Sequence, residues 1–243
     1  MTQRQFVRAA VTVAAALAAV ILVGMVIRST QARAQEEARW RGHEGEDVEN
    51  SKIQIGFKIA PVPLNLSGKN RELVGLGSYI VNARVDCNGC HTAGPANPAV
   101  PAEYAAFAPG GVPEFGQPLK VNPATYLGGG RDFGPLFGLP HLFTRNLTPD
   151  KTGLPEGGHT FAEFVQIMRS GTDFDHLHPT CTGAPNGTCI VAPFDGALLQ
   201  VMPWPFYAQM TDHDLRAIYE YLSAIPCIEN PAPAPSILHN DCK

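Results

Sequence analysis

The sequence contains few charged residues and little of the alternation that marks β-strands. Charged side chains make up 16% of its 243 residues, against about 25% in typical soluble domains. Residues 35–243 hold 14 basic and 22 acidic side chains, and this excess of acid argues against nucleic acid as a partner. The sequence also lacks a strand–helix–strand pattern and internal repeats, so neither a parallel sheet nor a repeat architecture is expected.

Acidic residues are missing altogether from the first 34 positions, where the nineteen residues 9–27 carry no charge and are flanked by arginines. That length can cross a bilayer, so we predict an uncleaved transmembrane helix that anchors the chain. The sequence Ala-Arg-Ala at 32–34 leaves a cleaved signal peptide as the alternative. Both interpretations export the rest of the chain, and we expect a bacterial inner-membrane protein whose folded part lies in the periplasm.

Composition divides the chain into four segments. Residues 1–34 are the anchor or signal peptide, and residues 35–66, polar and then Pro-rich, are expected to form an extended tether. A single domain is predicted over 67–230, followed by a C-terminal tail at 231–243. Within the domain, 18 of the 54 residues at 92–145 are Gly or Pro, which predicts a long loop insertion that wraps over a cofactor.

Regular structure in the domain is predicted to be mainly α-helical. Apolar residues recur at helical spacing over 70–83, 160–170 and 211–225. Thr160 and Glu163 have the spacing of a capping box at the start of the second of these helices. We therefore expect a few helices joined by long Gly/Pro-rich loops.

The six cysteines fall into two groups. In an oxidising compartment Cys181, Cys189, Cys227 and Cys242 can pair in three ways. Local pairing, 181–189 and 227–242, is favoured because each bond closes a segment that lacks periodic structure. The tail would then be stapled by a disulfide, and the other two cysteines, at 87 and 90, are left for a cofactor.

Those two cysteines belong to the stretch VDCNGCHTAG, in which His91 directly follows Cys87 and Cys90. A reactive dithiol is normally found near a strand–helix–strand unit, which the sequence lacks. A zinc site would need a fourth ligand, and the adjacency of Cys90 and His91 suits a tetrahedral site poorly. Covalent haem c explains every position, because the two thiols form thioethers with the porphyrin and the histidine ligates the iron. We expect one covalently bound haem c.

The sixth iron ligand is predicted to be Met202. Met168 lies on the apolar stripe of a helix and Met210 directly precedes another, so both fit core packing better. Met202 lies next to Pro203 and Pro205, which are expected to hold the chain extended and leave the thioether free.

His176 and His178 are the alternative. They lie in the stretch DFDHLHP with Asp173 and Asp175. These four side chains could bind a separate metal, or one of the histidines could replace Met202 on the iron.

With these motifs the sequence resembles the class I cytochrome c family: a helix leading into Cys-Asn-Gly-Cys-His, a Met-Pro step and a closing helix LRAIYEYL. The segments TRNLTPDKTGL, TFAEFVQIMRSG and MPWPFYAQM are similar to the cytochrome subunits of periplasmic membrane-bound dehydrogenases. Those subunits usually carry three haem motifs, whereas this chain has a single Cys-x-x-Cys-His.

The resemblance implies roles for particular residues. Cys87 and Cys90 would be the thioether residues, His91 the proximal ligand and Met202 the distal ligand, while Arg145 and Asn146 would line the haem pocket. The first and last helices would cross, with Gly75 and Gly77 near Tyr219 and Leu222.

The expected function is one-electron transfer between a protein donor and a protein acceptor, without bond chemistry. Two alternatives stay open. The chain could be a permanent haem subunit of a dehydrogenase or of a respiratory or photosynthetic complex. It could also be a haem enzyme or gas sensor with an open sixth position.

Overall fold

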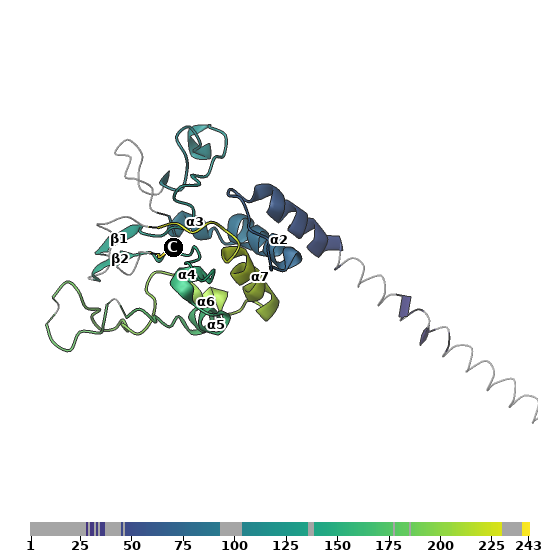
Figure 1. Ribbon diagram of the computed structural model, residues 1–243. Coiled ribbons are helices and arrows are strands. Elements are labelled where there is room, and N and C mark those ends of the chain that lie inside the picture. The colour runs from purple at the N-terminus through teal and green to yellow at the C-terminus, as the bar shows by residue number, and fades with distance from the viewer. Residues whose placement is uncertain are drawn as a thin grey trace, which may run out of the picture. The chain divides into compact units, whose positions relative to one another are not determined.

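The computed structural model describes residues 28, 30, 31, 33, 35, 36, 45, 47–92, 104–135, 139–176, 178–184, 186–229 and 240–243 (Figure 1). The chain divides into two units, residues 1–50 and 51–243. The predicted anchor at 9–27 lies outside the described residues. Among the helices that are described, none is both long and apolar enough to span a bilayer.

The second unit begins with a helical segment, residues 51–59, where an extended tether was expected. Ile53 and Phe57, four positions apart and so on one face of the helix, pack against the core. Ser78 donates a hydrogen bond of 2.7 Å to the carbonyl of Gly56. The prediction of an extended tether over 35–66 therefore needs correction: among its described residues, 47–59 are helical and the Pro-rich residues 60–66 are not.

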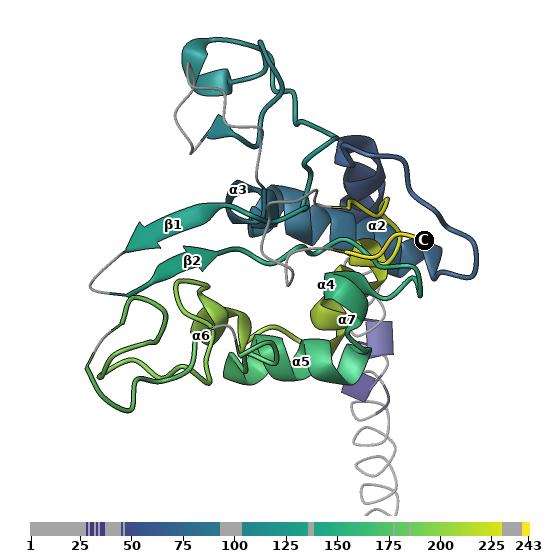
Figure 2. The same ribbon diagram turned by 60° about the vertical axis from the view of Figure 1, so that its left-hand side comes forward.

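The core is built where helix α2 (Arg71–Tyr79) crosses helix α7 (Asp212–Leu222), as Figures 1 and 2 show. Asn70 and Thr211 cap their first turns through side-chain oxygens. A Cβ on Gly77 would lie 1.9 Å from the carbonyl oxygen of Ala217, so the crossing depends on the absence of a side chain. The predicted crossing is therefore present.

The neighbours of the two crossing glycines differ in detail from those expected. Gly77 meets Ala217 and Tyr221 of α7, which lie one or two positions from the expected Tyr219 and Leu222. Gly75 faces Ile53 and Phe57 of the segment 51–59 instead of α7. The reason is that the helical segment 51–59, which the sequence analysis took for a tether, occupies that side of α2.

A second group of short helices packs beside α7 (Figure 2). Helix α5 (Phe161–Ser170) has the predicted capping box and ends at Gly171, whose φ is +69°. Helix α6 (Trp204–Tyr207) begins after Pro203, and helix α4 (Pro155–Gly158) precedes α5. The prediction that residues 203–205 are extended was wrong. Pro205 fits the first turn of helix α6, where no amide donor is needed.

The Gly/Pro-rich insertion contains more regular structure than predicted. Strands β1 (Asp132–Pro135) and β2 (His141–Phe143) pair antiparallel, and helix η3 (Pro113–Phe115) is a single 3-10 turn. The described residues thus form a mixed fold of helices, long loops and one two-stranded sheet, so the prediction of a mainly α fold holds in part. The strands of this sheet are too short to show alternation in the sequence.

Both predicted disulfides are present. Cys181 bonds to Cys189, and Cys227 bonds to Cys242 with a Cα–Cα distance of 5.8 Å. Cys87 and Cys90 are the cysteines with free thiols. The pairing leaves the two thiols of the CNGC motif available for other chemistry.

We predict that Gly77→Ala destabilises the protein by about 1–3 kcal/mol or more, because α2 and α7 must separate to admit the methyl group. Chemical denaturation followed by circular dichroism measures the change. Gly183→Ala is the control, since a Cβ there meets nothing within 4 Å and should change stability by less than about 0.5 kcal/mol. Equal stability of the two variants would contradict this account of the crossing.

Candidate haem-binding site

The CNGC motif forms its own helical turn, α3 (Cys87–Cys90), after the π-helix η1 (Ile80–Arg84) that continues α2. Asp86, with a φ of +47°, breaks the chain direction and accepts a hydrogen bond from the Gly89 amide at 3.2 Å. A Cβ on Gly89 would lie 2.5 Å from the Asp86 carboxylate. The motif is therefore a compact turn, and a side chain at position 89 would displace the Asp86 carboxylate that caps it.

Asn88 and Gly89, between the two cysteines, bond the Gly/Pro-rich insertion that follows the motif. Asn88 is buried, and its side-chain oxygen accepts a hydrogen bond of 2.9 Å from the amide of Leu127. The carbonyl of Gly89 accepts a hydrogen bond from the guanidinium of Arg131. The residues between the two cysteines thus hold the insertion against α3.

His91 is oriented by a hydrogen bond between its Nδ1 and the carbonyl oxygen of Arg145, at 2.9 Å. A carbonyl can only accept, so Nδ1 carries the proton and the lone pair of Nε2 is left free. Burial lowers the pKa of His91, which favours the neutral imidazole. This is the tautomer and protonation state that a metal ligand requires.

Two adjoining cavities, of about 350 and 90 Å³, open onto the motif. Cys90, His91, Met202 and Glu156 line both of them. Cys87 lines the smaller one together with core residues of α5 and α7. The structure therefore brings Met202 to the cavity that Cys87, Cys90 and His91 line, although it lies more than 100 positions from them in the sequence.

Met202 is held by local contacts. Its amide donates to the carbonyl of Gln200 at 2.7 Å, and its carbonyl accepts from the amide of Trp204 at 2.9 Å. Its side chain is partly buried against the core. Met168 and Met210 line the smaller cavity but not the larger one. Met168 is a buried core residue, as the sequence analysis expected.

Arg145 contributes its backbone to His91 and its side chain to two carboxylates. The guanidinium lies 2.8 Å from Asp173 and 2.7 Å from Asp175. The contact to Asp175 is an ion pair by distance, without the alignment of a hydrogen bond. Asn146 also lines the larger cavity, but its amide bonds the backbone of Ile228 at 2.8 Å.

A separate metal site at the DFDHLHP stretch does not form. Among the described residues, no three His, Cys, Asp or Glu side chains gather as a metal ion would require. Asp173 and Asp175 instead pair with Arg145. His178 does line the larger cavity, so it stays an alternative to Met202.

A reactive dithiol fits the site poorly. Burial, with a smaller contribution from Asp86, raises the pKa of the Cys87 thiol to about 12. A nucleophilic cysteine needs the thiolate, which this environment disfavours at neutral pH. The Cys87 thiol is therefore poorly suited to disulfide exchange.

Glu156 and Asn240 are among the cavity residues that sequence reasoning missed. Glu156 has a φ of +53°, and one of its carboxylate oxygens is buried without a hydrogen-bond partner. Asn240 is 2% exposed and lies in the C-terminal tail. A carboxylate between Pro and two glycines was the available signal for Glu156, whereas the sequence holds none for Asn240.

Comparison of the chain with family models, with curated proteins and with solved structures finds no significant match. The assignment of the site therefore depends on its own geometry and chemistry.

We predict that Glu156→Gln stabilises the protein at high pH but not at low pH. Burial, with a smaller contribution from Asp175, raises the pKa of Glu156 from 4.5 to about 7. Because the unfolded chain releases this proton first, the wild type loses stability as the pH rises from 4.5 to 7. The variant escapes that loss, and its advantage at pH 8 should be on the order of 2–3 kcal/mol.

Unfolding free energies at pH 4 and pH 8 test this expectation. Glu114→Gln makes the same change at an exposed position and serves as the control. An advantage of Glu156→Gln that is as large at pH 4 as at pH 8 would show that charge is not the cause.

Proposed function

We propose that the protein is a one-electron carrier, a c-type cytochrome with a single covalent haem ligated by His91 and Met202. One observation supports the proposal above all others. The imidazole of His91, with Nε2 free, and the thioether of Met202 line the same two cavities beside the two free thiols. This set of side chains suits haem c, since each would have one role in holding it.

The chain's own residues would do four things. Cys87 and Cys90 would attach the porphyrin through thioether bonds, and His91 would ligate the iron from a side fixed by the Arg145 carbonyl. Met202 would close the sixth position and keep substrates from the iron. Bound haem supplies an iron that cycles between Fe(II) and Fe(III), and methionine ligation and burial favour Fe(II).

The proposed setting is the periplasmic face of a bacterial inner membrane, with residues 9–27 as the anchor. Anchoring raises the effective concentration of the haem domain near membrane-bound partners. The excess of acidic side chains in residues 35–243 favours protein donors and acceptors with basic docking faces.

A permanent subunit of an oxidoreductase complex is the second candidate, and the lobe formed by residues 104–121 favours it. The bridge between Phe107 and Val121 closes this lobe, which projects from the helices at the top of Figures 1 and 2. Phe115 is 52% and Leu119 is 68% exposed on it. Large apolar side chains gathered on a projection are typical of a binding surface.

We predict that Met202→Ala removes the weak sulfur-to-iron charge-transfer band from the spectrum of the oxidised protein. The thioether is the source of that band, and the truncated side chain cannot reach the iron. Alkaline pyridine should still show covalent haem, because both cysteines remain. Absorption spectra of the oxidised and reduced proteins give both results.

Met210→Ala and His178→Ala are the matched controls, and both should keep the band. A band that survives in Met202→Ala would refute the assignment of this ligand. Loss of the band in His178→Ala would instead show that Met202 needs this histidine in order to ligate the iron. High-spin iron in the wild type would favour the haem enzyme or sensor.

For the second candidate, we predict that Phe115→Ser with Leu119→Ser abolishes copurification with a large oxidoreductase subunit while the haem spectrum is unchanged. Replacing the two apolar side chains removes the surface that would be buried. Detergent extraction and size-exclusion chromatography measure the association. Ile55→Ser, at a residue 44% exposed elsewhere, is the control. A wild type that elutes alone would leave the free carrier as the function.

A further inference from the structure

The carbonyl that orients His91 lies in a segment without regular structure, residues 144–150. Helices and strands therefore do not fix its position. Residues 146–149 are nevertheless all buried, so their polar groups need partners inside the protein. The question is which part of the chain supplies them.

Part of the answer is the segment that follows α7. Asn146 donates from its side-chain amide to the carbonyl of Ile228 at 2.8 Å. The amide of Ile228 donates in return to the hydroxyl of Thr148 at 3.0 Å. Asn146 and Thr148 are also joined, since the side-chain oxygen of Asn146 accepts from the Thr148 hydroxyl at 2.7 Å.

The backbone of Leu147 bonds Leu127 and Glu156, and the C-terminal tail supplies the partners of residues 148 and 149. The side-chain amide of Asn240 donates to the carbonyl of Thr148 at 2.8 Å, to its hydroxyl at 3.0 Å and to the carbonyl of Pro149 at 3.3 Å. Thr148 is completely buried and Asn240 nearly so. One side chain from the tail thus contacts two consecutive residues of the segment that holds His91.

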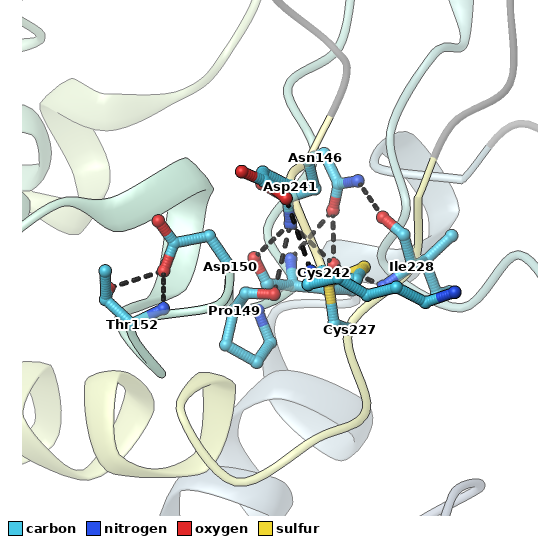
Figure 3. The surroundings of a disulfide bond; sticks show 11 residues. Asn146, Pro149, Asp150, Thr152, Cys227, Ile228, Asp241 and Cys242 are labelled. Atoms are coloured by element: carbon cyan, nitrogen blue, oxygen red, sulfur yellow. Dashed lines mark hydrogen bonds between the residues drawn. A yellow bond between two sulfur atoms is a disulfide. The ribbon is translucent and has the colours of Figure 1, made fainter.

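The tail itself is fastened at two points, as Figure 3 shows. The disulfide between Cys227 and Cys242 joins it to the end of the α7 segment. Lys151 donates from its backbone to the carbonyl of Asp241 at 2.6 Å and from its side chain to the Asp241 carboxylate. These bonds place Asn240 over residues 148 and 149.

We infer that the disulfide-stapled tail, through Asn240, is a positioning element for the proximal histidine. It holds residues 146–149 so that the Arg145 carbonyl stays in line with Nδ1 of His91. This inference rests on the proposed function, because it concerns the imidazole as an iron ligand. A hydrogen bond at Nδ1 raises the basicity of the imidazole, so the tail would help to set the reduction potential of the haem.

The test is Asn240→Ala in the haem-containing protein. Removing the amide leaves the two carbonyls unpaired and frees the segment, so the bond between Arg145 and His91 weakens. The imidazole then donates less to Fe(III), and the reduction potential should rise in a redox titration. Nitrogen-edited NMR of the reduced protein should show the Nδ1 proton of His91 exchanging with water at least tenfold faster.

Two further variants make the test specific. Cys227→Ala with Cys242→Ala releases the tail without touching Asn240 and should act in the same direction. If Asn240→Ala does not accumulate, this double cysteine variant is sufficient to test the inference. Cys181→Ala with Cys189→Ala removes the other disulfide and should lower stability without changing the potential or the exchange rate.

A tail that serves only stability would give a different result. Both tail variants would then melt at lower temperature while the potential and the Nδ1 exchange rate equal those of the wild type, and the inference would fall. The proposed function would survive that outcome, because it depends on the wild-type spectra. A wild type without covalent haem would overturn both.

Discussion

The site depends on one hydrogen bond, between Nδ1 of His91 and the carbonyl of Arg145. It joins the CNGCH motif at the end of the first core helix to an irregular segment more than 50 positions later. Without it the imidazole could rotate and either nitrogen could carry the proton. With it the free lone pair has one position. The imidazole of His91 is thereby held in one orientation, and it lines both cavities.

The α2–α7 crossing supplies the rigid frame for that bond. Because Gly77 lets the two backbones touch, η1 and α3 continue from α2 at a fixed place beside α7. A buried cluster extends the frame: the hydroxyls of Tyr126 and Tyr221 are 2.8 Å apart, and Tyr126 donates to Asn82 at 2.6 Å. Tyr126 belongs to the insertion, Asn82 to η1 and Tyr221 to α7. The insertion is therefore bonded to both helices and is part of the core, although its sequence contains mostly loop formers.

Features that depend on residues close together in the sequence were predicted, whereas features that depend on contacts between distant residues were not. The capping box of α5 and the cap of α7 are encoded within four residues, and both helices were predicted with their starts. Both disulfides close short segments and were predicted as well. The helix at 51–59 is stable through contacts with α2, and β1 and β2 need each other, so neither was visible locally. Asn240 lies 92 positions from Thr148, and no pattern connects them. Of the cavity residues, the CNGCH motif predicted Cys90 and His91 and the Met-Pro step predicted Met202, whereas Asn240 and Glu156 could be found only from the fold.

The two sides of the cavities are held by different means. On the side of His91, the side chain of Asn240 and the backbone of Ile228 bond the buried polar groups of residues 146–149. On the side of Met202 the restraints come from α5. The ring of Trp204 lies 2.2 Å from the position that a Cβ on Gly171 would take. Arg169 bonds the carbonyl of Ala208 and, at 2.7 Å, the carboxylate of Asp212.

The backbone before Met202 is strained. Val201 has a φ of +68° and is 48% exposed, so Met202 follows a strained, solvent-facing residue. The position of His91 is thus fixed by buried hydrogen bonds, whereas that of Met202 depends on packing against one helix. In the proposed haem site, a change of ligand would therefore begin on the Met202 side.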